Sequence, residues 1–296
     1  MHLESYLLEH RQKVDKALGD FLPPEHAYPP IIFRAVRYSL FAAGKRIRPI
    51  LCMAAAECLG GDADETLPVA CALEMIHTYS LIHDDLPAMD NDDYRRGILT
   101  NHKIFGENIA ILAGDALLTE AFHLLSRPDL LRTLEAAKRL DLIHDISLAA
   151  GFFGMVGGQV VDVQSEGKAV DETALHYIHS RKTGAMITTS VRSGAVLAGG
   201  NRQEVDALVR YGTQVGLAFQ IADDILNVEG EEKRLGKPTG TDRKLGKATY
   251  PALFGIEASK QRGQQLLADA LEAIGPFGGR AEPLRQIARH IVERDY

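Results

Sequence analysis

The stretch SLIHDDLPAMD at residues 80–90 closes an apolar helical run with three aspartates, and it constrains the fold more than any other part of the chain. Asp84 and Asp85 follow the apolar residues directly, whereas Pro87 disfavours the helical conformation at the residue before it. The helix is therefore expected to end or bulge here, and a bulge would bring Asp90 back beside Asp84. Carboxylates are rarely buried unless they are paired or bind metal.

A second aspartate pair, Asp223-Asp224, also follows an apolar run, at residues 217–222. Asp223 and Asn227 are four residues apart and share one helical face. Either pair alone is more typical of a solvated surface, but the apolar runs indicate that both stand at the ends of buried helices. Two such clusters facing each other across a helical core predict Mg²⁺, which binds carboxylates together with waters and substrate phosphates.

Basic residues recur near both clusters, although the chain is acidic overall, with a net charge of −7 and a pI near 5.9. This balance argues against a nucleic-acid partner, which requires an extended basic face. The cations are local instead, and together with carboxylates and metal they predict a pocket for polyanions. They occur in GKRIRP at residues 44–49 and at Arg95, Arg96, Lys182, Lys237, Lys244 and Lys247.

Apolar residues recur at spacings of three and four almost throughout, and no convincing alternating strand is found. The 296 residues, 46% of them hydrophobic, are expected to form one all-α domain, residues 1–296, as a large bundle of about ten helices. The polar segment 229–247 is the one long internal loop and predicts a lid. The expected helices span residues 2–20, 30–43, 48–59, 66–86, 107–126, 130–147, 149–166, 171–197, 203–228, 250–272 and 283–294.

The sequence also predicts the cellular compartment. No uninterrupted run reaches the roughly 18–20 apolar residues of a membrane span, and no signal peptide opens the chain, so a cytoplasmic protein without membrane insertion is expected. Cys52, Cys58 and Cys71 are odd in number and lie among Ala, Leu and Met. This setting predicts buried reduced thiols rather than disulfides or a metal site.

The stretch at residues 80–90, followed by Arg95-Arg96-Gly97, resembles the first aspartate-rich motif of the trans-prenyl diphosphate synthases. GKRIRP, KTG at residues 182–184 and DDILN at residues 223–227 are similar to that family's remaining blocks, in the same order. The match covers nearly the whole chain. The two extra residues in the first motif resemble the bacterial farnesyl and the bacterial and plant geranylgeranyl branches. The resemblance implies a helical bundle of the isoprenoid synthase type around a prenyl-binding cavity, and a homodimer.

The resemblance also implies a metal arrangement. Three Mg²⁺ ions, or Mn²⁺ in their place, would bind an allylic diphosphate, two of them through Asp84 and Asp90 and one through Asp223. Asp85 and Asp224 would support these ligands. The electrostatics agree, because a diphosphate and carboxylates repel each other unless divalent cations lie between them.

The substrates implied by the resemblance are isopentenyl diphosphate and an allylic partner, either dimethylallyl or geranyl diphosphate. Mg²⁺ and cationic side chains would stabilise the departing diphosphate, and side-chain oxygens would face the allylic cation. The implied residues are Arg95, Lys182, Lys237 and Lys247 at the allylic diphosphate, Thr183 and Gln220 at the cation, Gln159 with Asp162 in the cavity, and Gly44, Lys45, Arg48, His77 and Arg96 at isopentenyl diphosphate.

Product length is predicted from the residue five positions before Asp84, which floors the tail cavity in the family. Here it is Tyr79, about 7.5 Å down the helix at 1.5 Å per residue. Its ring predicts early termination at farnesyl diphosphate, C15. The alternative is geranylgeranyl diphosphate, because the neighbouring Ser80 is small and the sequence does not show what other helices add to the floor.

Three other functions compete with this prediction. A class I terpene cyclase would require an Asn/Asp-x-x-Ser/Thr-x-x-x-Glu pattern near residue 223, which is absent from the sequence. A His-Asp metal phosphohydrolase would use His83-Asp84 and His144-Asp145 but leaves the second aspartate pair unexplained. A non-catalytic partner subunit would be expected to lack one motif. Two departures from the family pattern are Asn227 in place of an aspartate and a C-terminal region with Arg294 but no terminal lysine.

Overall fold

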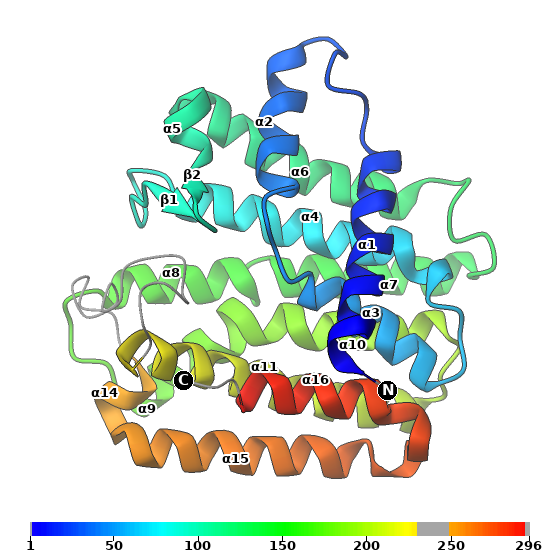
Figure 1. Ribbon diagram of the computed structural model, residues 1–296, viewed down its shortest axis with the longest axis vertical. Helices are drawn as coiled ribbons and strands as arrows, with labels where there is room; N and C mark the ends of the chain where they lie inside the picture. The colour runs from blue at the N-terminus through cyan, green and yellow to red at the C-terminus, as the bar shows by residue number, and fades with distance from the viewer. Residues whose placement is uncertain (1, 230–248, 294–296) are drawn as a thin grey trace.

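The computed structural model describes residues 2–229 and 249–293, and this part of the chain is a helical bundle (Figure 1). The expected all-α fold is confirmed. Lys237, Lys244 and Lys247 and most of the expected lid lie outside the described residues. The helices are α1 Leu3–Phe21, α2 Pro30–Leu40, α3 Ile47–Cys58, η1 Asp64–Thr66, α4 Leu67–Asp84, α5 Asn101–Phe105, α6 Glu107–Ser126, α7 Ala136–Ala150, α8 Met155–Ser165, α9 Glu172–Ile178, η2 His179–Gly184, α10 Ala185–Leu197, α11 Arg202–Glu229, α14 Tyr250–Phe254, α15 Ile256–Ala273, η3 Gly275–Ala281 and α16 Glu282–Val292.

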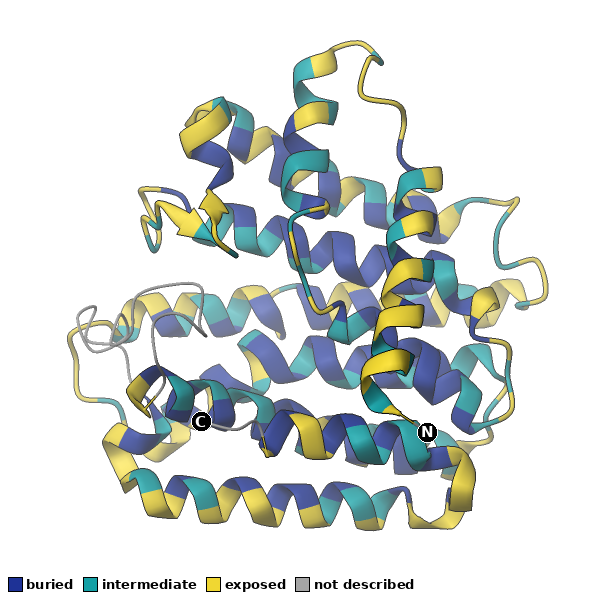
Figure 2. Ribbon diagram, in the orientation of Figure 1, coloured by how far each residue is buried: buried dark blue, intermediate teal, exposed yellow. Residues whose placement is uncertain are grey.

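Helix α4 is the centre of the bundle. It is buried on all sides over most of its length, as expected for a helix without a polar face, and it packs against α1, α3 and α6 (Figure 2). One hydrophobic cluster surrounds α4, and a second joins α11, α15 and α16 to α3. Two helices that are held this firmly fix the positions of the aspartates at their ends.

The end of α4 and the end of α11 lie on the same side of the bundle (Figure 1). The expected bulge after α4 is present, because the Asp90 amide donates to the Asp84 carbonyl at 2.9 Å. A short antiparallel hairpin follows, with β1 Tyr94–Arg95 paired to β2 Ile98–Leu99. These strands of two residues each are too short for an alternating pattern to reveal them in the sequence.

Several helix boundaries differ from the expected ones. Residues 171–197 were expected as one helix, but the described chain has a π-helical segment, His179–Gly184, between α9 and α10. The expected helix at 250–272 is interrupted at Gly255, whose φ of 82° lies in the left-handed region. The expected helix at 130–147 begins only at Ala136, because Arg139 donates to carbonyls of the preceding turn.

Two segments, Glu107–Ser126 and Ala136–Ser165, are long and apolar enough to cross a membrane by length and mean hydropathy alone. Neither is an uninterrupted apolar run, and the second is divided where α7 ends at Ala150 and α8 begins at Met155. Buried residues make up 39% of the apolar window in each. The other residues are half-buried or exposed, and Leu112 and Leu148 are among the exposed apolar ones.

Candidate active site

The first aspartate cluster is held by the hairpin. Asp85 is 3% exposed, and its Oδ1 accepts from Nε of Arg95 at 2.6 Å, while Arg95 also contacts Asp92 at 3.4 Å. Burial raises the pKa of Asp85 to about 7, and the Arg95 guanidinium opposes this shift. Asp85 and Arg95 are thus bound to each other, while Asp84 and Asp90 are half-buried at the helix end.

The second cluster is divided in the same way between a buried and a more accessible carboxylate. Asp224 is 4% exposed; its Oδ1 accepts from Gln220 at 3.1 Å, and its Oδ2 accepts from the Tyr250 amide at 2.8 Å and lies 3.2 Å from Nε2 of His179. Asp223 is half-buried on the adjacent face of α11. His179 and Tyr250 were not identified from the sequence, because neither belongs to a motif that the analysis singled out.

The π-helical segment positions the central lysine and threonine. Nζ of Lys182 contacts Oδ2 of Asp162 at 2.6 Å, and the Thr183 hydroxyl donates to Oε1 of Gln220 at 2.9 Å. Helix α8 approaches the segment so closely that a Cβ added to Gly158 would lie 2.2 Å from the backbone nitrogen of Lys182. Single π-helical turns are frequent at functional sites, and this one brings Thr183 and Gln220 together.

A basic pocket of about 470 Å³ opens beside these elements. Two of its lining residues stand next in the chain to residues bonded to the clusters. Arg96 follows Arg95, which is bonded to Asp85, and Phe219 precedes Gln220, which is bonded to Asp224. All five residues expected at isopentenyl diphosphate line it, together with six that were not expected there. The lining residues are Arg11, Ala43, Gly44, Lys45, Arg46, Ile47, Arg48, Glu74, His77, Arg96 and Phe219.

The pocket brings several positive charges together, some exposed and some half-buried. Burial and the nearby Arg48 guanidinium hold the pKa of His77 well below its usual value, so this imidazole is neutral at pH 7. Burial also lowers the pKa of Arg48, to about 10, with Glu74 opposing and Arg96 adding to the shift. Arg48 and Arg96 remain charged at pH 7, and an anion bound between them would relieve their mutual repulsion.

Glycine at position 44 allows Arg96 to approach the loop. A Cβ on this residue would lie 2.6 Å from Nη1 of Arg96, which is closer than non-bonded atoms come. The next residue but one, Arg46, is buried and ties the loop to α4 and α1 through Glu74 at 2.7 Å and Asp15 at 2.8 Å. Arg96 itself donates to the Ala42 carbonyl at 3.4 Å, which connects its guanidinium to the start of the same loop.

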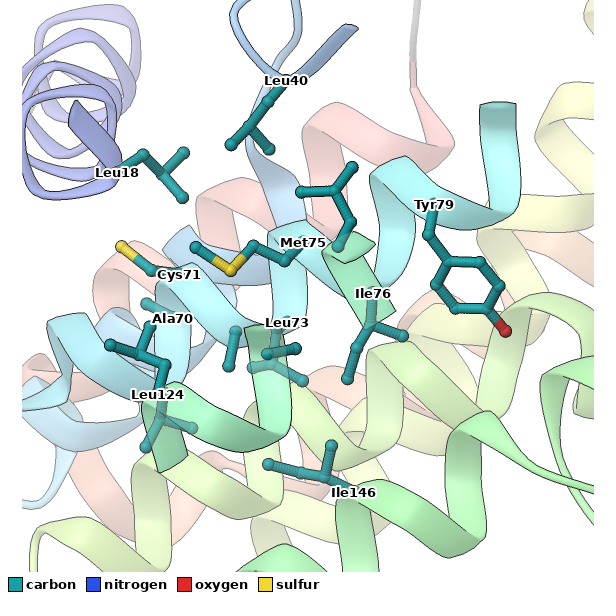
Figure 3. Packing of buried hydrophobic residues seen from close by; sticks show 14 of the residues in the cluster. Leu18, Leu40, Ala70, Cys71, Leu73, Met75, Ile76, Tyr79, Leu124 and Ile146 are labelled. Atoms are coloured by element: carbon teal, nitrogen blue, oxygen red, sulfur yellow. The ribbon is translucent and has the colours of Figure 1, made fainter. Parts of the chain in front are cut away.

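Tyr79 and Gln159 are the residues that the sequence analysis expected in the cavity behind the carboxylates. Tyr79 is 7% exposed on α4, and Figure 3 shows its ring at the edge of the buried cluster that includes Leu73 and Ile76. Burial, with a contribution from Asp84, raises the pKa of Tyr79 to about 12. The neighbouring Ser80 hydroxyl donates to the His77 carbonyl at 2.9 Å.

Gln159 stands on α8 one turn before Asp162. Both polar atoms of its amide are buried without a hydrogen-bond partner among the described residues. A buried polar group of this kind is unusual in a structural position and is more common where a ligand completes the site.

The carboxylates fit the chemistry of Mg²⁺. Within residues 2–229 and 249–293, no three His, Cys, Asp or Glu side chains converge to enclose a metal by themselves. Mg²⁺ is usually held by one or two carboxylates while waters and substrate phosphates complete its octahedron. Asp84, Asp90 and Asp223, at the ends of two helices on one side of the bundle, offer such a partial set.

Comparisons with known proteins agree with this arrangement. Residues 29–275 match the family model "Polyprenyl synthetase". The chain is 49% identical over 262 residues, covering 88% of both sequences, to farnesyl diphosphate synthase of Geobacillus stearothermophilus. It is 47% identical to geranylgeranyl diphosphate synthase of Cyanophora paradoxa, covering 99% of this chain and 97% of the other. The crystal structure of an FPP/GFPP synthase from Zymomonas mobilis superposes with a TM-score of 0.89 at 37% identity, covering 98% and 99%. The chain therefore belongs to the polyprenyl synthetase family, the trans-prenyl diphosphate synthases.

Proposed function

We propose that this prenyltransferase condenses isopentenyl diphosphate head to tail with dimethylallyl and then geranyl diphosphate to give farnesyl diphosphate. The observation that carries the proposal is the basic pocket, which is lined by none of the five aspartates of the two clusters. It would hold one diphosphate without metal, while the clusters would hold the other through metal. Geranylgeranyl diphosphate is the second candidate, because the residue beside Tyr79 is the small Ser80 and relatives of both names are similarly close.

The allylic diphosphate would bind at Asp84, Asp90 and Asp223, with Asp85 and Asp224 holding their neighbours in place. When bound, Mg²⁺ supplies charge neutralisation for the diphosphate and for the negative charge that develops as it leaves. Arg95 and Lys182 would add their positive charges to this stabilisation. Arg95 is held by its bond to Asp85, and Lys182 by its bond to Asp162. Lys237 and Lys247, outside the described residues, are proposed to act at the same diphosphate.

The C1–oxygen bond of the allylic substrate breaks first, and its electron pair leaves with the diphosphate. The oxygens of Thr183 and Gln220, 2.9 Å apart, would face the allylic cation, which prefers oxygen lone pairs to a cationic neighbour. The double bond of isopentenyl diphosphate then forms the new carbon–carbon bond. A proton from the former isopentenyl unit passes to the released diphosphate, as the family resemblance implies, so no protein base is required.

The basic pocket would hold isopentenyl diphosphate through its charged residues and the neutral His77. We expect Gly44→Ala to raise the KM for this substrate roughly tenfold, because the added Cβ displaces the Arg96 guanidinium and weakens a charged hydrogen bond. The KM for the allylic substrate should stay unchanged. Steady-state kinetics with each substrate varied in turn would measure both values.

Gly19→Ala on α1 is the matched control for this prediction, since a Cβ there meets no atom within 4 Å. The Gly19 variant should behave like the wild type. Equal KM values for isopentenyl diphosphate in the Gly44 variant and the wild type would mean that the pocket does not hold this substrate.

The product is tested by incubating the purified protein with Mg²⁺, isopentenyl diphosphate and either dimethylallyl or geranyl diphosphate, followed by mass spectrometry. A C15 product supports the farnesyl proposal, and C20 would replace it with the geranylgeranyl alternative. Release of phosphate without condensation would favour a phosphohydrolase, and intact substrates would favour a non-catalytic subunit.

A homodimer is also part of the proposal, and it rests on the apolar surface of α6, α7 and α8. These helices are neighbours. Leu112 on α6 is exposed at 53%, Leu148 on α7 at 47%, and Phe152, in the turn between α7 and α8, at 84%. Exposed apolar surface of this extent on consecutive helices is typical of a protein interface. A cytoplasmic location is supported by the three free, buried cysteines, which suit a reducing compartment.

We expect Leu112→Glu to convert the dimer to monomers, because a two-fold axis would bury two carboxylates at once without partners. Size-exclusion chromatography with light scattering gives the mass directly. Leu8→Glu, at a residue 54% exposed on α1, should leave the dimer intact. A wild-type protein that runs as a monomer would contradict the proposal.

A further inference from the structure

Helix α1 contributes one cation, Arg11, to the basic pocket, and this residue belongs to none of the sequence motifs. Arg11 lies on α1 and lines the pocket together with Lys45, Arg48 and Arg96. In Figure 1, α1 runs across the face of the bundle, and it packs against α3 and α4, which carry the pocket residues. The N-terminal helix is thus one wall of the pocket, although it precedes every motif of the family.

The Arg11 side chain is held in position by Asp15, one turn later on the same helix. Its Nε lies 3.5 Å from Oδ2 of Asp15, while Oδ1 of that carboxylate accepts from Arg46 at 2.8 Å. Asp15 therefore connects Arg11 to the loop that carries Lys45, directly before α3 and its Arg48. The contact uses Nε, and the two Nη groups come after this atom along the side chain.

Arg11 is much more exposed than Arg46, the buried arginine that shares Asp15 with it. The Arg46 side chain is 2% exposed and is enclosed by Glu74 and Asp15, whereas the Arg11 side chain is 44% exposed. A long guanidinium at the pocket edge can rotate toward an incoming phosphate and bind two of its oxygens in a fork. An isolated ion pair between Arg11 and Asp15 at i and i+4 would stabilise α1 only slightly.

We propose that Arg11 is a further diphosphate-binding residue of the basic pocket, positioned by Asp15, and that it contacts the metal-free diphosphate of isopentenyl diphosphate. This inference rests on the proposed function for the identity of the ligand. The chemistry, in which a cation from the N-terminal helix helps to line an anion site, depends only on the pocket.

The experiment is a calorimetric titration of isopentenyl diphosphate into the full-length protein in EDTA, where the metal-dependent site cannot contribute. Arg11→Gln should raise Kd roughly tenfold, as expected for the loss of one charged hydrogen-bonding group, and Arg11→Lys should recover part of the affinity. Lys16→Gln, an exposed cation on the same helix that does not line the pocket, should bind like the wild type.

Salt dependence distinguishes direct binding from a structural effect. If Arg11 contacts the phosphate, the wild-type Kd should rise more steeply with salt than the Kd of Arg11→Gln, because the variant has one fewer charge contact to screen. Equal Kd values for the wild type and Arg11→Gln would overturn the inference, as would a wild type that does not bind in EDTA. Failure of the condensation assay with normal binding in EDTA would overturn the proposed function alone.

Discussion

Asp84→Asn is expected to lower kcat on the order of a thousandfold, the scale of losing one preorganised group that stabilises charge on a leaving oxygen. Asp84 ends α4, and the Asp90 amide is bonded to its carbonyl at 2.9 Å. The substitution keeps the shape of the side chain and removes its charge, so the helix end should remain intact. Steady-state rates over a range of Mg²⁺ concentrations would show both the lower kcat and a higher half-saturating Mg²⁺ concentration.

Asp93→Asn is the matched control, since Asp93 belongs to the same acidic run but pairs with Lys103 at 2.6 Å. Its activity should be close to that of the wild type, and removal of Mg²⁺ with EDTA should stop condensation in every variant. An Asp84→Asn enzyme that keeps a tenth or more of the wild-type kcat would show that the first cluster does not bind the catalytic metal.

The features that sequence reasoning predicted are those in which the covalent chain itself imposes the geometry. Pro87 cannot continue a helix, so the bulge that brings Asp90 to Asp84 follows from residues only a few positions apart. The burial of Asp85 and Asp224 follows similarly from the apolar runs before them. The family resemblance implied which residues distant in the chain share one site, and Gly44, Lys45, Arg48, His77 and Arg96 line one pocket.

The features that sequence reasoning missed depend on contacts between helices. The approach of His179 to Asp224 requires the π-helical segment, and that segment depends on how closely α8 and α11 pack against it. Periodicity indicates a helix over residues 171–197 but does not distinguish an α-helical turn from a π-helical one. Arg11 was missed because its spacing to Asp15 is ordinary for an exposed ion pair, and only the position of α1 reveals the pocket beside it.

Tyr79→Ala is expected to change the main product from C15 to C20 or longer. Tyr79 lies five residues before Asp84 on α4, its ring meets His83 edge-on at 5.7 Å, and it is 7% exposed. Alanine at this position removes the ring at the depth where the growing prenyl tail would meet it. Mass spectrometry of the products formed from geranyl diphosphate with excess isopentenyl diphosphate measures the change.

Two further variants show whether the ring itself sets the length. Tyr79→Phe keeps the ring and should still stop at C15, whereas Ser80→Ala, at the small neighbouring residue, should leave the product unchanged. Condensation should continue in all three variants, because the carboxylates and the basic pocket are untouched. A Tyr79→Ala enzyme that still stops at C15 would mean that side chains from other helices form the floor. In that case the tail extends along a different face of α4, and residues on α6 and α8 become the next to vary.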